Sequence, residues 1–392
     1  MGVALVAAGQ TPFGKHPEAG VKELFHDAVR DLAAGVDRGW DAERLDAVYV
    51  GSLSCGQGMQ LGNFAPALLD HAGLPQVPAL HVESACASGG FALLQAIQAV
   101  ASGEHSCVLA AGVEKMRDVS GERGRYWLGI SGDTEYERLA GLTFAGIFGL
   151  MASRLLHDGT VTREQMARVA VKNHRHGALN PDAMFRRPLT LEQVLGAPVV
   201  AAPLTGFDCC PTTDGAAAVL VVDAEIAAEL ADEPVEVIGW GAATDTLALH
   251  DRDDLTRLKA ARRAADAAYA MAGIGPGDLD LAEVHDCFTV AELIAYGELR
   301  LSDPAESGAR LEAGEFDLGG RLPVNTSGGL KAKGHPIGAT GIGQVVELFH
   351  QLRGDVDVPE RQVSGARTGL AYNMGGSGAS ATVHLLRRGG GA

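Results

Sequence analysis

Short apolar runs alternate with stretches of helical periodicity along most of the chain, and this alternation is typical of an α/β protein with parallel strands. The apolar runs of the first part predict strands at residues 3–8, 47–51, 79–83 and 106–112. Apolar positions at helical spacing predict the helices between them, at residues 22–36, 64–72 and 88–102. A further strand at residues 216–222 is apolar throughout, as expected of a strand that is buried on both faces.

The same order of elements starts again after Glu233-Pro234. Strands are predicted at residues 235–240, 279–284, 322–325, 369–373 and 380–386, with helices at residues 254–272, 289–300 and 337–352. The repeated order predicts two similar α/β halves, residues 1–228 and 229–392. Two unrelated α/β units are the alternative, because the repeat is one of pattern and not of residues.

Residues from about 115 to 201 follow neither pattern and are predicted to form an insertion in the first half. An insertion of this length in a compact domain usually has a function, such as a lid or a binding loop. Within it, His174 and His176 stand beside Lys172 and Arg175. We interpret this group as a solvated helix face and not as a metal site.

The balance of charge excludes several classes of partner. The 392 residues include 49 acidic and 32 basic side chains, a net charge of −17, so most of the surface repels nucleic acid and anionic lipid. Arg186-Arg187 and Lys331-x-Lys333 are the local exceptions, where a polyanionic ligand would find basic side chains.

The sequence shows no targeting segment and no apolar stretch suited to a membrane helix. Six cysteines are too few for a disulfide framework, so a reducing cytoplasm is the expected location.

The sharpest chemical signal is Cys86, in a segment that joins a predicted strand to a predicted helix. A thiol before a helix lies near the positive end of the helix dipole, so a lowered pKa and a nucleophilic thiolate are expected there. Gly89 and Gly90 leave the start of the helix without side chains, which permits close approach of a substrate or a second helix. A small buried cysteine in a tight turn is the alternative.

A second signal is His335, in the segment Gly334-His-Pro-Ile-Gly-Ala-Thr-Gly341 that also leads into a predicted helix. If the two halves repeat, His335 precedes its helix as Cys86 precedes the equivalent one, and both side chains face one site. A cysteine with a histidine in reach is the minimal activated nucleophile. A turn residue that caps a loop is the alternative for His335.

Two more segments carry candidate chemistry. His285 and Cys287 follow a predicted strand, at the edge where parallel sheets place functional residues, and suit an oxyanion donor and an acid/base. They would also suit a metal, but no second pair of ligands stands at zinc-site spacing, so no metal is expected. The glycine turn that starts at Asn373 and includes Gly375 offers backbone N–H groups to an oxyanion.

In their order along the chain, these segments resemble the thiolase superfamily, in particular its sterol carrier protein 2-type and archaeal acetyl-CoA acetyltransferase branch. The similarity extends over nearly the whole chain. It includes Thr11-Pro-Phe-Gly-Lys15, Cys86-Ala-Ser-Gly-Gly90, Leu139-Ala-Gly-Leu-Thr-Phe144, Thr162-Arg-Glu-Gln165, Asp214-Gly-Ala-Ala-Ala218, His285-Asp-Cys-Phe288, the segment from Gly334 to Gly341 and the last glycine turn. The resemblance implies a thiolase fold, in which two similar α/β halves form a five-layer core with an inserted loop domain.

The resemblance also implies a role for each matching residue. Cys86 would carry the acyl group as a thioester, His335 would activate it, and the backbone N–H groups of Cys86 and Gly375 would form an oxyanion hole. His285 and His335 would stabilise the enolate oxygen of a second acyl-CoA. Most thiolases have a second catalytic cysteine where this chain has Asn373, and in the branch resembled here Cys287 is taken to replace it as the acid/base.

The implied activity is that of an acyl-CoA C-acyltransferase, which condenses acyl-CoA units or cleaves a 3-ketoacyl-CoA with CoA as a substrate. Acyl transfer to a non-CoA acceptor and retro-aldol cleavage are alternatives, although the presence of Cys86 argues against the latter. A third alternative is a subunit that depends on a small zinc-ribbon and OB-fold partner protein. The resemblance further implies a homodimer or homotetramer, and Arg186 and Arg187 are candidates to bind the CoA phosphates.

Overall fold

The computed structural model describes residues 2–54, 62–119 and 121–390. Its main feature is a nine-stranded sheet in the order β3-β2-β4-β7-β1-β8-β11-β10-β9. The first five strands of this order come from the N-terminal half: β1 Val3–Gln10, β2 Ala47–Gly51, β3 Ala79–Val82, β4 Cys107–Glu114 and β7 Gly215–Asp223. The other four come from the C-terminal half: β8 Val235–Thr244, β9 Leu281–Glu283, β10 Thr368–Gly375 and β11 Ser380–Arg388. A small separate sheet contains β5 Val199–Ala201 and β6 Leu204–Thr205.

The two halves of the sheet have the same strand order, read outward from the centre. In each half the strand that comes first in the sequence, β1 or β8, is central. The strand that comes last, β7 or β11, lies next to it, and the remaining strands lie further out. The halves meet where β1 pairs antiparallel with β8, with Ala4 opposite Glu236. Residues 322–325 were expected to add one more strand, but they form only an isolated bridge between Ala282 and Val324. Pro323 has no N–H to donate, which keeps this pairing short.

The direction of the strands differs from the expected parallel sheet. β2 is parallel to both β3 and β4, and β9 is parallel to β10. The central strands are antiparallel, since β1 pairs antiparallel with β7 and β8, and β11 with β8 and β10. A strand that is buried on both faces has the same apolar sequence in either direction, so this pattern did not distinguish the two.

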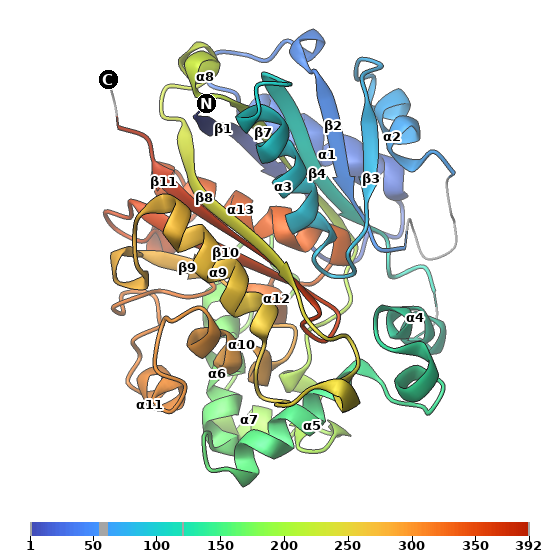
Figure 1. The fold of residues 1–392 in the computed structure, drawn as a ribbon, viewed down its shortest axis with the longest axis vertical. Coiled ribbons are helices and arrows are strands. Elements are labelled where there is room, and N and C mark those ends of the chain that lie inside the picture. The colour runs from blue at the N-terminus through green and yellow to red at the C-terminus, as the bar shows by residue number, and fades with distance from the viewer. Residues whose placement is uncertain (1, 55–61, 120, 391–392) are drawn as a thin grey trace.

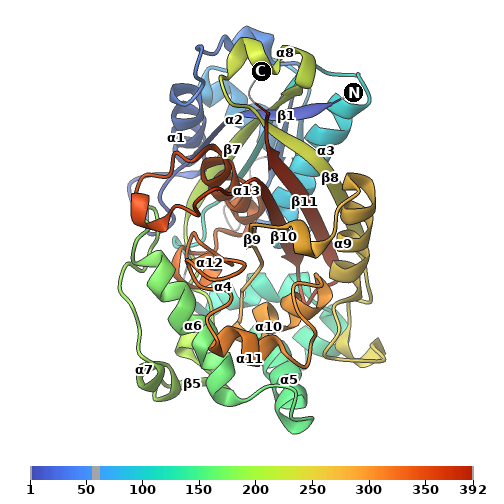
Figure 2. The same cartoon turned by 90° about the vertical axis from the view of Figure 1, so that its left-hand side faces the viewer.

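The helices complete five layers. Helices α1 (Val21–Ala34) and α2 (Phe64–Ala72) cover the outer face of the first half, and α9 (Lys259–Ala272) covers that of the second. Helices α3 (Ser88–Ala101) and α13 (Ile337–Arg353) lie between the two halves, where α13 contacts β4 and β7 as well as β10. Figures 1 and 2 show this order, with α1 and α9 on opposite sides in Figure 2. The short helix α8 (Ala224–Leu230) lies near the junction between the halves.

The two central helices meet backbone to backbone at their N-terminal ends. A Cβ atom on Gly89 of α3 would lie 2.5 Å from the carbonyl oxygen of Gly338 in α13. A Cβ atom on Gly341 would lie 2.4 Å from the backbone nitrogen of Gly90. The prediction that Gly89 and Gly90 permit the approach of a second helix is therefore confirmed. Because Cys86 precedes α3 and His335 precedes α13, this contact brings the two residues to one place.

The remaining helices form the lower part of the molecule in Figure 1. Four come from the insertion: α4 (Gly121–Leu128), α5 (Phe144–His157), α6 (Arg163–Gly177) and α7 (Leu191–Leu195). Helices α5 and α6 contact α10 (Thr289–Glu298), and α6 also contacts α7, α11 (Ser307–Glu312) and α12 (Gly329–Ala332). The expected solvated face of α6 was wrong, because His174, His176 and Lys172 are all buried. This face of α6 packs against the second half, where the Nζ of Lys172 donates to the carbonyl of Val324 at 2.6 Å.

Among the helices described, none has both the length and the apolar composition needed to cross a bilayer.

Candidate active site

Cys86 lies in a tight turn between β3 and α3. Ala85 before it has a left-handed backbone with φ of 50°, which is strained for a residue with a Cβ atom. The Ser88 hydroxyl holds this turn, since it accepts from the Ser84 N–H at 2.9 Å and donates to the Ala85 carbonyl at 2.6 Å. Such strain at a single position is typical of a functional site. The turn directs the thiol toward the junction of the two halves.

His335 lies immediately before α13. Its Nδ1 atom is 2.7 Å from the hydroxyl oxygen of Thr340, one turn into the helix, and that hydroxyl is 3.0 Å from the Pro336 carbonyl. A bridge to Thr212 holds the backbone of His335 from the other side. The Nε2 atom of His335 is buried and has no hydrogen-bond partner among the described residues. The imidazole is thus fixed through one nitrogen and open at the other.

His285 completes the cluster from the end of β9. Its ring lies 5.1 Å from that of His335, centroid to centroid, at an angle of 88°. The Cys86 sulfur and one ring nitrogen from each histidine all lie within 4.8 Å of one another. The structure therefore brings together three of the predicted catalytic side chains, two that follow strands β3 and β9 and one that precedes α13.

Burial keeps these groups uncharged. It raises the pKa of the Cys86 thiol to about 12, against the expected lowering by the helix dipole. The N–H groups of Gly376 and of Cys86 itself favour the thiolate, but removal from water is the larger effect, so that expectation was wrong. Burial also lowers the pKa of His335 to about 3 and that of His285 well below its usual value, with the charge of His335 adding to the effect. The resting site is a neutral thiol beside two neutral imidazoles.

Cys287 lies two residues beyond His285 and is buried. Its carbonyl accepts from the N–H of Cys210 at 2.9 Å, so the chain around Cys209-Cys210 runs alongside it. Burial raises the pKa of the Cys287 thiol well above its usual value, and negative charge on Cys210 or Cys86 would raise it further. Cys287 is thus near enough to Cys86 and Cys210 for a charge on either sulfur to affect its pKa.

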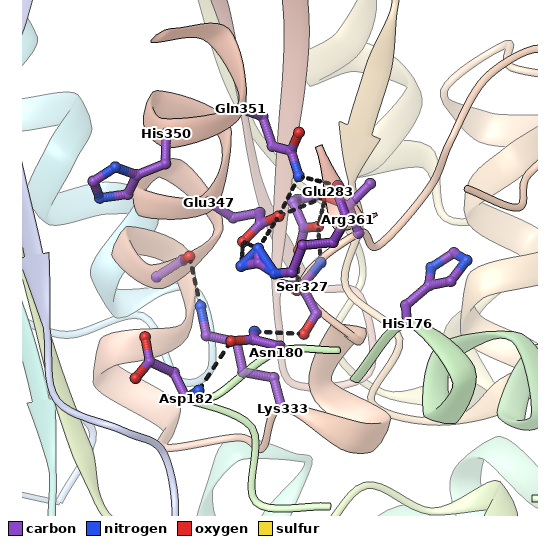
Figure 3. A network of polar contacts seen from close by, with 12 residues as sticks. His176, Asn180, Asp182, Glu283, Ser327, Lys333, Glu347, His350, Gln351 and Arg361 are labelled. Carbon is purple, nitrogen blue, oxygen red and sulfur yellow. Dashed lines mark hydrogen bonds and ion pairs between the residues drawn. The ribbon is translucent and has the colours of Figure 1, made fainter. Parts of the chain in front are cut away.

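A buried network of charged and polar groups fixes the segments next to the site, and Figure 3 shows it around Glu283, Ser327, Glu347 and Arg361. Glu283, at the end of β9, accepts from the hydroxyl and the N–H of Ser327 at 2.6 and 3.0 Å. Glu347 on α13 pairs with Arg361, with a shortest distance of 2.8 Å. Burial, together with the charge of Glu347, raises the pKa of Glu283 to about 7. The network fixes the strand that carries His285 against the loop that leads to His335.

The last glycine turn closes the site from β10. A Cβ atom on Gly375 would lie 2.5 Å from the Ser84 carbonyl, which shows how closely this turn approaches the Cys86 loop. A Cβ atom on Gly376 would lie 2.7 Å from the Ser131 carbonyl of the insertion. The insertion thus lies directly over the turn, beside the nucleophile. Glycine is required at Gly376 also because its φ is 61°.

Arg186 and Arg187 line a separate pocket of about 340 Å³. Its other lining residues are mostly aromatic or apolar: His174, Met184, Phe185, Leu189 and Phe207. None of Cys86, His285 and His335 is among them. The pocket combines guanidinium groups with aromatic faces, a lining suited to a phosphorylated ligand with a planar ring.

Sequence reasoning missed three residues that support the site. Glu114 at the end of β4 is buried and accepts from the N–H of Gly338 at 3.0 Å, so its carboxylate binds the N-terminal end of α13. Thr340 holds His335, and Cys210 adjoins Cys287. A carboxylate at the end of a buried strand was the available signal for Glu114.

Comparisons with known proteins agree with this arrangement. The model "Thiolase, N-terminal domain" matches residues 3–225, and the model "Thiolase C-terminal domain-like" matches residues 241–388. The acetyl-CoA acetyltransferase of Methanothermobacter thermautotrophicus is 44% identical over 98% of this chain and 99% of its own length. Sterol carrier protein 2 of Rattus norvegicus is 34% identical, covering 99% of this chain and 72% of that protein. Among solved structures, the Ltp2-ChsH2(DUF35) aldolase superposes with a TM-score of 0.85 over 99% of this chain and 98% of its own at 24% identity, a likeness of fold.

Proposed function

This chain belongs to the thiolase family, and we propose that it is an acetyl-CoA acetyltransferase that works through a thioester on Cys86. The relatives with that name match over nearly their full length at 40 to 44% identity. The observation that carries the catalytic proposal is the cluster of Cys86, His285 and His335, whose reacting atoms lie within 4.8 Å of one another. A thiol beside a neutral imidazole can be activated at the moment of attack.

In the first half-reaction, His335 takes the proton of the Cys86 thiol as the sulfur attacks the thioester carbonyl of acetyl-CoA. The C–S bond to CoA breaks, and the CoA sulfur leaves with that proton as a free thiol. The carbonyl oxygen is negatively charged in the tetrahedral intermediate. Backbone N–H groups at Cys86 and at the Gly375 turn stabilise it, and Gly376, whose N–H acts on the thiol, belongs to the same turn.

In the second half-reaction, the Cys287 thiol passes its proton to Nε2 of His335, and the thiolate that results takes a proton from the α-carbon of a second acetyl-CoA. The enolate carbon attacks the acetyl group on Cys86, which forms acetoacetyl-CoA and releases the Cys86 sulfur, and this sulfur takes the proton from His335. His285 and His335 stabilise the enolate oxygen, because a thioester α-proton is only weakly acidic and the enolate needs fixed hydrogen-bond donors. The reverse sequence is thiolysis.

Substrate and partner contacts complete the proposal. Arg186 and Arg187 bind the phosphates of CoA in the pocket that they line. We propose a homodimer or homotetramer, and a small zinc-ribbon/OB-fold partner, since one solved structure with this fold is titled as an assembly with a DUF35 protein. A reducing cytoplasm suits the chemistry, because Cys86 and Cys287 are free thiols in the structure.

The proposal is tested by mixing the purified protein with acetoacetyl-CoA and CoA and measuring the loss of acetoacetyl-CoA. Turnover that disappears in Cys86→Ser, with the variant still folded by circular dichroism, supports the thiolase activity. Turnover that persists in Cys86→Ser refutes the nucleophile. Turnover that requires an added DUF35-type protein supports the partner-dependent form of the same function.

A further inference from the structure

We propose that Asn373 is a positioning residue that fixes the tautomer of His285, with the lone pair on Nδ1 and the proton on Nε2. In this form His285 can only donate a hydrogen bond into the site, to the oxygen of the bound thioester or enolate. The inference rests on the proposed function for the identity of that oxygen. It gives a role to the residue at which this chain departs from most thiolases.

The first observation is a backbone donor. The N–H of Met374 donates to Nδ1 of His285 at 3.4 Å, and the side-chain Nδ2 of Asn373 lies 3.1 Å from the same atom. A backbone N–H has no lone pair to offer and can act only as a donor. Nδ1 must therefore be the acceptor, and a neutral ring then carries its proton on Nε2.

The second observation fixes the side-chain amide of Asn373. Its Oδ1 accepts from the N–H of Gly90 in α3 at 3.2 Å, so the amide nitrogen faces His285. The space for this oxygen depends on two glycines, since a Cβ atom would lie 2.9 Å away on Gly90 and 2.4 Å away on Gly341. The amide thus bridges α3 and His285 where α3 and α13 meet. A cysteine at position 373 could not provide both contacts.

His335 has the complementary arrangement. The Thr340 hydroxyl has a single proton, and the Pro336 carbonyl at 3.0 Å accepts it. The hydroxyl oxygen then accepts from Nδ1 of His335 at 2.7 Å, which leaves a lone pair on Nε2. The two imidazoles therefore offer opposite functions to the site, a donor at His285 and a proton acceptor at His335.

The same contacts explain why the cluster is poorly suited to zinc. One sulfur and two imidazole nitrogens within 4.8 Å of one another are the donor set that Zn²⁺ prefers. A histidine that ligates a metal usually donates its other N–H to a carboxylate or carbonyl. His285 instead faces two donors at Nδ1, so its Nε2 lone pair is not available. An aspartate at position 373 would replace the amide donor 3.1 Å from Nδ1 by a charged acceptor, which outweighs the longer 3.4 Å contact of the Met374 N–H and favours the other tautomer.

The test is the ¹⁵N NMR spectrum of the full-length protein labelled in its histidines, with His285 assigned by its loss in His285→Gln. The wild-type spectrum, which needs no substitution of Asn373, is expected to show a protonated Nε2 and an unprotonated Nδ1. In Asn373→Asp the two assignments are expected to interchange. A wild-type Nδ1–H, or an unchanged tautomer in Asn373→Asp, would overturn the inference.

Zinc binding gives an independent readout that needs no activity. Asn373→Asp is expected to bind Zn²⁺ about 10- to 100-fold more tightly than wild type, and to lose this gain when combined with Cys86→Ala. Asn373→Ala, which lacks the carboxylate, is the matched control and is expected to show no such gain. Equal zinc affinity in Asn373→Asp and Asn373→Ala contradicts the tautomer role.

Kinetics then separate this inference from the proposed function. Exchange of the α-protons of acetyl-CoA is expected to fall by about 100-fold or more in Asn373→Asp, because a donor to the enolate oxygen is lost. Acetylation of Cys86 is expected to fall less than this exchange. If wild-type protein never becomes acetylated, the proposed function fails while the NMR and zinc results still decide the tautomer. Equal losses in both half-reactions would count against a specific role at the enolate.

Discussion

Replacement of Cys287 tests whether the site has an acid/base that is separate from the nucleophile Cys86. Cys287→Ala is expected to retain acetylation of Cys86 within a few-fold, because no step of acyl transfer uses this thiol. Condensation and α-proton exchange are expected to fall by about 100-fold or more, the usual loss for a general acid/base. The measurement is intact mass for acetylation and deuterium exchange of acetyl-CoA for the second step. Equal loss of both half-reactions would contradict the assignment.

Single residues of the site were predictable where they stand in a local pattern. Cys86, His285 and His335 each follow or precede a regular element. The repeated order of elements predicted one site for Cys86 and His335, and the resemblance to thiolases added His285. The pKa of Cys86 was not predictable, because burial by distant segments outweighs the local helix end. The sequence showed only that Asn373 stands where most thiolases have a cysteine. Its hydrogen bonds were not predictable, because its partners His285 and Gly90 lie 88 and 283 residues away in the chain.

The elements assemble the site through glycine contacts between α3 and α13. Gly89→Ala places a Cβ atom 2.5 Å from the Gly338 carbonyl oxygen and 3.2 Å from the Ile342 nitrogen, both backbone atoms of α13. Overpacking of this kind costs about 1–3 kcal/mol of unfolding free energy, and displacement of α13 moves His335 away from Cys86. We expect a lower urea midpoint together with at least tenfold slower acetylation.

The matched control is Gly277→Ala, where a Cβ atom meets nothing within 4 Å. Its unfolding free energy is expected to change by about 0.5 kcal/mol or less. Wild-type stability and acetylation in Gly89→Ala would show that the two helices do not need this close contact.

Most elements could be predicted because apolar periodicity reports burial directly. Two features could not. Strand direction depends on the path of the insertion between β4 and β7, and residues 322–325 have the composition of a strand although they pair only through one bridge. The division at residues 228 and 229 and the limits of the insertion at residues 115–201 stay predictions, and the match of separate N- and C-terminal models is consistent with them.

Among the described residues, five buried histidines are neutral in the folded state. Burial lowers the pKa of His174 to about 4, that of His176, His335 and His384 to about 3, and that of His285 well below its usual value. Below pH 6.5 the unfolded chain binds protons at these positions and the folded chain does not. Folding stability therefore falls on acidification, by up to about 1.4 kcal/mol per pH unit for each histidine.

Two buried carboxyl groups have the opposite effect on the pH dependence of folding stability. Burial raises the pKa of Glu283 and of Asp286 to about 7, so between their unfolded values and pH 7 the folded state binds the extra protons. Their contribution to stability falls as pH rises through this window. The five histidines outnumber them, so the net expectation is loss of stability as pH falls from 6.5 to 5.

His384→Leu tests this account, because the His384 side chain is buried on β11 and its Nε2 has no hydrogen-bond partner among the described residues. Urea unfolding at pH 8, 6.5 and 5.5 is expected to show a pH slope shallower by about one proton than wild type. The exposed residue His157, replaced by Asn, is the control for the substitution itself. An identical slope in wild type and His384→Leu would contradict the linkage.

The most direct measurement of the central claim is the intact mass of the purified protein after mixing with acetyl-CoA, beside Cys86→Ala under the same conditions. The account predicts a single acetyl group on wild-type protein and none on Cys86→Ala, with the adduct removed when CoA is added. Acetylation of equal extent in Cys86→Ala, or an adduct that CoA does not remove, would contradict a thioester on Cys86.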